Sequence, residues 1–321
     1  MPVRVYAAHA AAVGAVLAAT ALTGCGSPEQ DNSRRLRELT PMEQAFVERA
    51  EEQLIESCME SKGFRYWPAR VDSAEERQGG GYVQHDVAWA RKYGYEREFD
   101  VQAERARRAD RNTAYARALT QPELVRYNTA LDGSPDDGLM SVDLPGGGTV
   151  RTTTGGCRAT VADRLYGDFP AWFRAQKIAR NLSAVYVPVL VQDTRFKRAV
   201  GAWARCMNKA GHPYDTPLAI RAALPRLTRD TGRAAARALE VELAVAEATC
   251  ARSTPLFRTA RSLDREYRRE KLAPYRADIT SYRRMNLTAL AHAKAVMGPR
   301  SHRPARPLSS PEENHKKGTY P

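Results

Sequence analysis

The five cysteines of this chain are the residues whose type and spacing could do chemistry. A cysteine thiol can pair in a disulfide, ligate a metal ion or accept another covalent group. Cys25 lies at the end of an apolar run near the N-terminus, whereas Cys58, Cys157, Cys206 and Cys250 are distributed over the rest of the chain. These two settings indicate two different roles, one for Cys25 and one for the other four.

Residues 1–24 have the pattern of a secretory signal peptide. One charged residue, Arg4, precedes an apolar run from about Val5 to Leu22, and the sequence LTGC ends at Cys25. LTGC matches the lipobox of bacterial lipoproteins, in which the cysteine receives acyl chains such as palmitate and the chain is cut just before it. A transmembrane anchor and a signal peptide cut elsewhere are the alternatives. The short, alanine-rich run argues against a permanent span, which needs about 20 strongly apolar residues.

The location that follows is the extracytoplasmic face of a bacterial cell membrane, to which the lipid on Cys25 would anchor the protein. Residues 25–39 contain few apolar side chains and are expected to form a flexible tether. Residues 298–321 contain five prolines and almost no large aliphatic side chain, so they are expected to form a disordered basic tail. The folded body is expected to lie between these two segments.

The net charge indicates which partners are suitable. The formal charge of the chain is +13, and removal of Arg4 with residues 1–24 leaves 13 − 1 = +12. An anionic envelope component or a protein is therefore an expected partner, beside the membrane reached through Cys25. Nucleic acid is not expected, because the chain is exported and its arginines are scattered without a recognition motif.

A repeated string explains how the four remaining cysteines are placed. CMESKGFRY at 58–66 returns as CMNKAGHPY at 206–214, with cysteine, methionine, glycine and tyrosine at the same offsets. Each copy follows an apolar stripe of helical spacing, and each glycine is suited to end its helix. Cys250 ends another such stripe, whereas Cys157 follows a predicted hairpin. Four cysteines allow three pairings, and the repeat favours Cys58 with Cys157 and Cys206 with Cys250 over the other pairings and over free thiols.

The sequence predicts a mainly helical body built from two divergent, disulfide-pinned repeats, with one small β-hairpin. Capping boxes begin helices at Thr40 and Thr120, and alternating apolar residues around PGGG predict the hairpin at about 139–154. Pro188 is expected to kink or split a helical run. The first repeat with its hairpin is assigned to 40–190, and the second repeat with two closing helices to 191–297.

The set of motifs resembles uncharacterised secreted lipoproteins of actinomycetes. The resemblance rests on LTGC, the repeated CM-x3-G, a YGY element at 93–95, LTQPELVRYNTALDG and a turn-rich hairpin that runs into GGC. It covers most of the chain after Cys25. The resemblance implies the fold and the location described above, and it carries no activity, cofactor or catalytic residue to this chain.

Catalytic and metal-binding motifs are not recognised in the sequence. CxxC, HExxH, GxSxG and phosphate-binding glycine loops do not occur in their required contexts, so no catalytic residue, cofactor or metal site is assigned. Acidic residues on helices alternate with arginine and are interpreted as solvated ion pairs. An aromatic segment at 64–100 is interpreted as the cover of a small satellite core. It is also the candidate ligand surface, with these side chains as its members: Trp67, Trp89, Tyr93 and Tyr95.

The function expected from these observations is a non-enzymatic binding or interaction module, anchored by lipid at the cell envelope. The alternatives are a hydrolase of cell-wall polymer and a purely structural envelope protein. A hydrolase would need a pocket with two convergent carboxylates or an activated nucleophile. A structural spacer would need no concave site.

Overall fold

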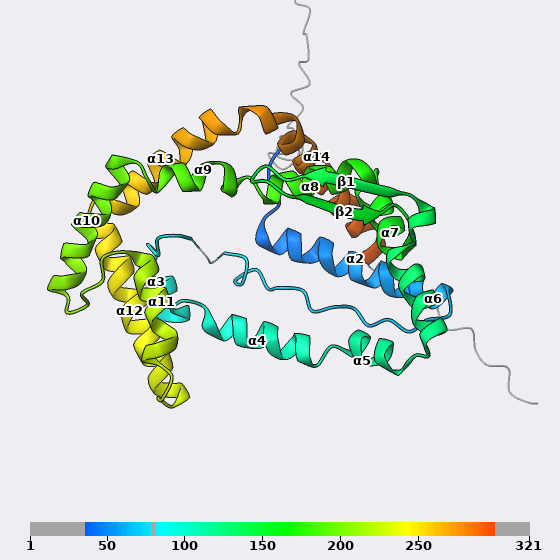
Figure 1. Cartoon of the computed structure of the whole chain (residues 1–321), viewed down its shortest axis with the longest axis horizontal. Coiled ribbons are helices and arrows are strands. Elements are labelled where there is room, and N and C mark those ends of the chain that lie inside the picture. The colour runs from blue at the N-terminus through cyan, green and yellow to red at the C-terminus, as the bar shows by residue number, and fades with distance from the viewer. Residues whose placement is uncertain (1–35, 79–80, 299–321) are drawn as a thin grey trace, which may run out of the picture. The chain divides into compact units, whose positions relative to one another are not determined.

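The computed structural model describes residues 36–78 and 81–298, and Arg37 begins a single compact unit. The expected signal peptide, Cys25, most of the expected tether and nearly all of the expected tail lie outside the described residues. Within the described ranges the chain is mainly helical, with one antiparallel pair of strands (Figure 1). The predicted fold class is confirmed at this level.

Helix α2 (Pro41–Ser61) begins as the sequence predicts. The Thr40 hydroxyl accepts a hydrogen bond from the Glu43 backbone N–H at 3.2 Å, and the Glu43 carboxylate accepts one from the Thr40 N–H at 2.8 Å. Arg37 also pairs with Glu43 at 2.7 Å, and Leu39 is only 6% exposed. Residues 37–39, assigned to the tether from the sequence, therefore pack as part of the body.

The two copies of CM-x3-G end their helices with the same hydrogen bonds. After α2, Gly63 has φ +82° and the Phe64 N–H donates to the Met59 carbonyl. After α10 (Thr194–Lys209), Gly211 has φ +83° and the His212 N–H donates to the Met207 carbonyl. This is the pattern of a Schellman motif, so the repeated string specifies a repeated helix stop.

A first apolar cluster surrounds the Cys58–Cys157 disulfide, whose Cα atoms are 5.7 Å apart. It joins α2 to α6 (Gln121–Asp132), α7 (Gly156–Tyr166) and α14 (Arg276–Met297), and α14 also packs against α8 (Phe169–Arg180). The sequence assigned α14 to the second repeat, whereas its buried face (Met285, Ala289, Ala293) belongs to this first cluster.

A second apolar cluster surrounds the Cys206–Cys250 disulfide, whose Cα atoms are also 5.7 Å apart. It contains residues of α9 (Ser183–Leu190), α10, α11 (Pro217–Leu227), α12 (Arg233–Ser253) and α13 (Leu256–Lys271). Trp203 and Met207 of α10 are fully buried there, as is Leu256 at the start of α13. Both predicted cysteine pairs are therefore present.

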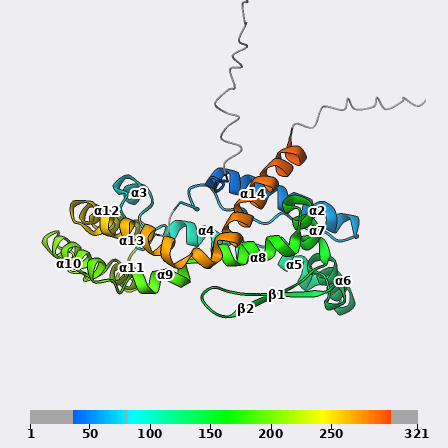
Figure 2. The ribbon, with the colours of Figure 1, turned by 90° about the horizontal axis from the view of Figure 1, so that it is seen from above.

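The predicted hairpin is confirmed as β1 (Leu139–Asp143) and β2 (Thr149–Thr153), which pair with Leu139 opposite Thr153 and Val142 opposite Val150. A short 3-10 turn (Pro135–Asp137) leads into it. Val142 is buried in the second cluster, and β1 packs on α8. Figure 2 shows α8 between the hairpin and α14.

The helical run after Asp168 is split at a different place from the one expected. Pro188 lies inside α9, and the break falls between α8 and α9 at Asn181 and Leu182. The Asn181 amide donates to the Lys177 carbonyl at 2.7 Å, which satisfies a carbonyl at the end of α8. Pro188 therefore does not split the run, and the Asn181 side chain lies where the first helix ends.

The segment between α2 and α6 crosses from one cluster to the other. It contains α3 (Val87–Tyr93), α4 (Arg97–Arg108) and α5 (Arg111–Ala118). Helix α3 packs on α12 through a small cluster of Ala90, Ala244 and Ala248, against which Tyr95 also packs. A second 3-10 turn (Ala273–Tyr275), which contains Pro274, separates α13 from α14.

Candidate functional site

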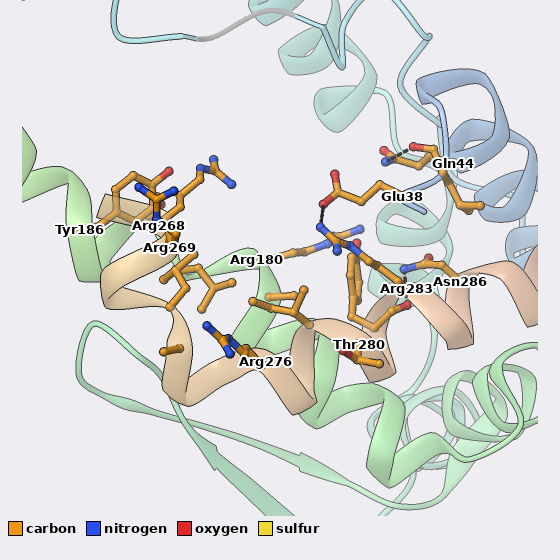
Figure 3. Close-up of a pocket in the computed structure, with 18 residues that line it drawn as sticks. Glu38, Gln44, Arg180, Tyr186, Arg268, Arg269, Arg276, Thr280, Arg283 and Asn286 are labelled. Atoms are coloured by element: carbon orange, nitrogen blue, oxygen red, sulfur yellow. Dashed lines mark hydrogen bonds and ion pairs between the residues drawn. The ribbon is translucent and has the colours of Figure 1, made fainter. Parts of the chain in front are cut away.

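A groove of about 700 Å³ lies where the two apolar clusters meet. Leu39 and Tyr282 reach it from the first cluster, and Leu182, Tyr186 and Leu272 reach it from the second. Its walls come from the residues before α2, from the junction of α8 with α9, and from the junction of α13 with α14 (Figure 3). We call this cavity the arginine groove.

Five arginines line the arginine groove, and Glu38 is the only carboxylate among the residues that line it. Figure 3 shows two of the arginines on the side of Tyr186 and two beside Glu38. Arg276 and Arg283 are seven positions apart on α14, which places them on one face about 10.5 Å apart along the axis. The five, in chain order, are Arg180, Arg268, Arg269, Arg276 and Arg283.

Three of these arginines are engaged by carboxylates of the body. Arg268 pairs with Asp264 at 2.9 Å, and its guanidinium lies 5.2 Å from the ring centre of Tyr186. Arg283 donates to Glu38 at 2.9 Å, and Arg180 lies 3.9 Å from Glu48. These contacts hold the side chains near the groove without filling it.

The remaining two arginines are available to a ligand. Arg269 and Arg276 are exposed, and neither has an ion-pair partner among the described residues. In addition, the Arg283 Nε is buried and has no hydrogen-bond partner within the described part of the chain. Guanidinium groups bind carboxylates and phosphates with paired, charge-assisted hydrogen bonds. The groove is therefore suited to an anion.

A second, smaller cavity adjoins the groove and differs from it in charge. This cavity of about 290 Å³ is lined by three carboxylates, Glu48, Glu51 and Glu52, and by two arginines, Arg70 and Arg180, and we call it the carboxylate pocket. The two cavities lie next to each other, because five residues line both of them: Leu39, Gln44, Arg180, Tyr282 and Asn286.

The three carboxylates of this pocket are engaged to different degrees. Glu48 accepts hydrogen bonds from both terminal nitrogens of Arg77, and Glu52 accepts one from the Tyr66 hydroxyl at 2.9 Å. Glu51 accepts one hydrogen bond, from the Tyr166 hydroxyl at 3.0 Å. Burial raises the pKa of Glu51, although that hydrogen bond opposes the shift. Its second oxygen, Oε1, accepts no hydrogen bond within the described residues.

A different acidic pair holds the YGY element in place. Glu247, which is fully buried, accepts the Tyr95 hydroxyl at 2.7 Å and the Gln84 N–H at 2.8 Å. Glu240, which is 3% exposed, accepts the Tyr95 N–H at 2.7 Å. Burial raises the pKa of the Glu247 carboxyl, and Arg221 at 3.3 Å opposes that shift. Hydrogen bonds to these two carboxylates attach the segment before α4 to α12.

Of the four aromatic residues predicted as a ligand surface, Trp89 and Tyr95 line one cavity of about 280 Å³ together with Arg221, whereas Trp67 lies elsewhere. Trp67 packs edge-on against Tyr115 of α5, while Trp89 packs on Tyr93 within α3. Tyr95 belongs to the Glu247 network, and all four side chains are partly buried. In these positions they cover α5 and α12, and none of them lines the arginine groove.

The residues of the arginine groove and the carboxylate pocket were not found from the sequence. Arg276 and Arg283 are seven positions apart, a spacing that places helical residues on one face, and Arg269 ends the preceding helix. Glu48, Glu51 and Glu52 have the i, i+3, i+4 spacing of one helix face, next to the buried stripe of α2. Both signals look the same as those of solvated charged faces, so only the packing of other helices over them identifies a cavity.

Within residues 36–78 and 81–298, no group of three or more histidine, cysteine, aspartate or glutamate side chains is placed to hold a metal ion. No helix in these ranges is both long enough and apolar enough to cross a membrane.

Models of protein families, curated proteins and solved structures were compared with the chain, and none of the three comparisons found a match.

Proposed function

We propose that this protein is a lipid-anchored binding protein of the cell envelope whose arginine groove captures an anionic ligand outside the membrane. The observation that carries the proposal is the composition of the groove, which has five arginines and one carboxylate in its lining. The lipid anchor at Cys25 and the location come from the sequence pattern of residues 1–25. The body presents the groove, and the anchor keeps it at the membrane.

The groove supports a binding role over a purely structural one. Burying or crowding like charges is unfavourable, so a spacer gains nothing from arginines gathered around a cavity. Arg269 and Arg276 carry no ion pair among the described residues, and this leaves two guanidinium groups for an incoming anion. A ligand of this class would include phosphorylated or carboxylated components of the envelope.

The carboxylate pocket is the feature that a hydrolase would use, because Glu51 has a raised pKa and a general acid requires one. A hydrolase also needs a second carboxylate that is free to act as a base or nucleophile. Glu48 is held by Arg77, and Glu52 is held by Tyr66 and the Ala69 N–H at 2.7 Å. Their engagement favours binding over hydrolysis.

The lipid anchor is tested with a fatty-acid probe in cells that express the full chain. The wild-type protein is expected to take up the label and to fractionate with membranes. The Cys25→Ser variant is expected to lose both properties, since one hydroxyl replaces the acylated thiol. An unlabelled wild-type protein would refute the anchor without affecting the groove.

Anion binding is tested by titrating the purified protein with inorganic phosphate in a calorimeter. The double variant Arg269→Ala/Arg276→Ala is expected to bind phosphate at least about tenfold more weakly, which corresponds to about 1.4 kcal/mol. The control variant is Arg265→Ala/Arg284→Ala, which removes two exposed arginines from the same two helices outside the groove. Equal losses in both variants would show a general charge effect and refute the site.

A further inference from the structure

We propose that the arginine groove and the carboxylate pocket form one bipartite site for a phosphorylated sugar, with the phosphate at the arginines and the sugar hydroxyls at the carboxylates. The inference deepens the proposed function and rests on it, because the phosphate end uses the groove already described. It adds the chemical class of the ligand and the residues that recognise its uncharged part.

The two cavities lie next to each other. Arg180, Gln44 and Asn286 line both of them, so a molecule that enters one is in contact with residues of the other. Tyr282 is also shared, and it lies parallel to Trp172 with ring centres 5.4 Å apart. Together the cavities have room for a ligand larger than a single anion.

The two cavities differ in charge, because five arginines and one carboxylate line the arginine groove, whereas three carboxylates and two arginines, Arg70 and Arg180, line the carboxylate pocket. Arg70 is paired with Asp72 and Glu76, which lie outside the pocket, so a ligand with anions along its whole length would meet more carboxylates than available arginines in the second cavity. A ligand that fills both cavities must therefore carry its negative charge at one end only. Its other end must offer hydrogen-bond donors to the carboxylates.

The polar groups of the carboxylate pocket can bind the hydroxyl groups of a sugar. Glu51 Oε1 accepts no hydrogen bond, and the Gln176 amide makes none, among the described residues. A carboxylate and an amide can each bind the hydroxyls of a sugar, with the amide serving as donor and acceptor. Tyr166 and Trp172 are stacked at 3.7 Å and form an aromatic wall of the same pocket.

Three probes separate the parts of the proposal: inorganic phosphate, glucose and glucose 6-phosphate, each titrated calorimetrically into the full chain. Glucose 6-phosphate is expected to bind about tenfold more tightly than phosphate, since a hydrogen bond to a charged group contributes about 1.5–3 kcal/mol. Glucose alone is expected to bind more weakly than either. Arg276→Ala is expected to weaken both phosphate-containing probes.

The variant Glu51→Gln distinguishes the two ends of the site. It keeps an acceptor for Tyr166 and replaces the carboxyl group that would bind the sugar hydroxyls, so it is expected to lower the affinity for glucose 6-phosphate about fivefold and to leave phosphate affinity unchanged. Glu56→Gln on the same helix is the matched control, because Glu56 does not line either cavity.

The outcomes separate this inference from the proposed function. If phosphate and glucose 6-phosphate bind equally, the bipartite site is refuted and anion binding by the groove stands. If neither probe binds, both proposals are refuted. If Glu51→Gln and Glu56→Gln have the same effect, the sugar end is not in the carboxylate pocket and the inference fails.

Discussion

The Tyr95 hydroxyl donates a 2.7 Å hydrogen bond to the buried carboxylate of Glu247, across 152 positions of the chain. This contact explains the aromatic residue in the YGY element, which the sequence offered as part of a ligand surface. The preceding residue, Gly94, has φ +60°, and a Cβ there would lie 2.8 Å from Glu240 Oε1 and Arg237 Nη1. The hydrogen bonds of Tyr95 therefore attach the segment before α4 to helix α12.

Replacing Tyr95 with phenylalanine is expected to destabilise the protein by about 1–3 kcal/mol, because a buried carboxylate loses a hydrogen-bond donor. Denaturant unfolding measures the change in free energy. Tyr115→Phe is the control, since the Tyr115 hydroxyl makes no hydrogen bond within the described residues. A cost for Tyr95→Phe no larger than that for Tyr115→Phe would show that the contact adds nothing.

Removing either disulfide by paired alanine substitutions is expected to destabilise the protein by about 4–5 kcal/mol on the loop-entropy model. The sequence separations are 99 for Cys58–Cys157 and 44 for Cys206–Cys250, so the two losses should be similar and slightly larger for the first pair. Urea unfolding under oxidising conditions measures both losses.

The pairing is checked separately by mass spectrometry of a non-reduced digest. Peptides joining Cys58 to Cys157 and Cys206 to Cys250 are expected. A peptide that joins Cys58 to Cys206 or to Cys250 would contradict the structure, and four alkylatable thiols would contradict both bridges.

Two glycines with nearly the same backbone angle are expected to differ in their tolerance of alanine. Gly63 has φ +82° with no atom within 4 Å of an added Cβ, so Gly63→Ala should cost about 1–2 kcal/mol through its left-handed backbone alone. Gly156 has φ +80°, and its Cβ would lie 2.3 Å from the Gly133 backbone nitrogen. Gly156→Ala should therefore cost more than about 3 kcal/mol.

Thermal unfolding of the two glycine variants, read by circular dichroism, makes this comparison. The Gly156→Ala protein is expected to melt well below the Gly63→Ala protein. Equal melting temperatures would mean that the close approach of Gly133 and Gly156 relaxes at little cost.

Deprotonation of Glu51 is expected to lower the free energy of unfolding as pH rises. Burial raises its native pKa above the ordinary value of 4.5, so the folded protein keeps the proton over a pH range in which the unfolded chain has lost it. The contribution of this group is fully present below about pH 4.5, the unfolded value, and is lost as pH rises through the native pKa.

The variant Glu51→Gln removes this titration and keeps the acceptor for Tyr166. Denaturant unfolding at pH 4 and pH 7 should show that Glu51→Gln gains stability relative to the wild type at the higher pH. Glu56→Gln should follow the wild type at both pH values. A Glu51→Gln protein that loses stability on going to pH 7 would reverse the assigned direction of the pKa shift.

The sequence by itself determined the local elements and the cross-links. Thr40 and Glu43 specify the start of α2, Gly63 and Gly211 specify two helix stops, and PGGG specifies the hairpin, because each signal acts within a few residues. The cysteine pairs also followed from the sequence, since the repeat of CM-x3-G implied equivalent partners. All of these inferences depend on short-range geometry or on internal symmetry.

Only the tertiary structure decided where charged residues meet. Arg276 and Glu51 are ordinary polar residues of amphipathic helices in the sequence, and they line adjoining cavities because α14 packs against α2 and α8. Glu247 is buried because α3 and the residues before it cover α12. Burial and charge clustering arise from contacts between distant segments, and a helical periodicity that marks an exposed face cannot show which other helix will cover it.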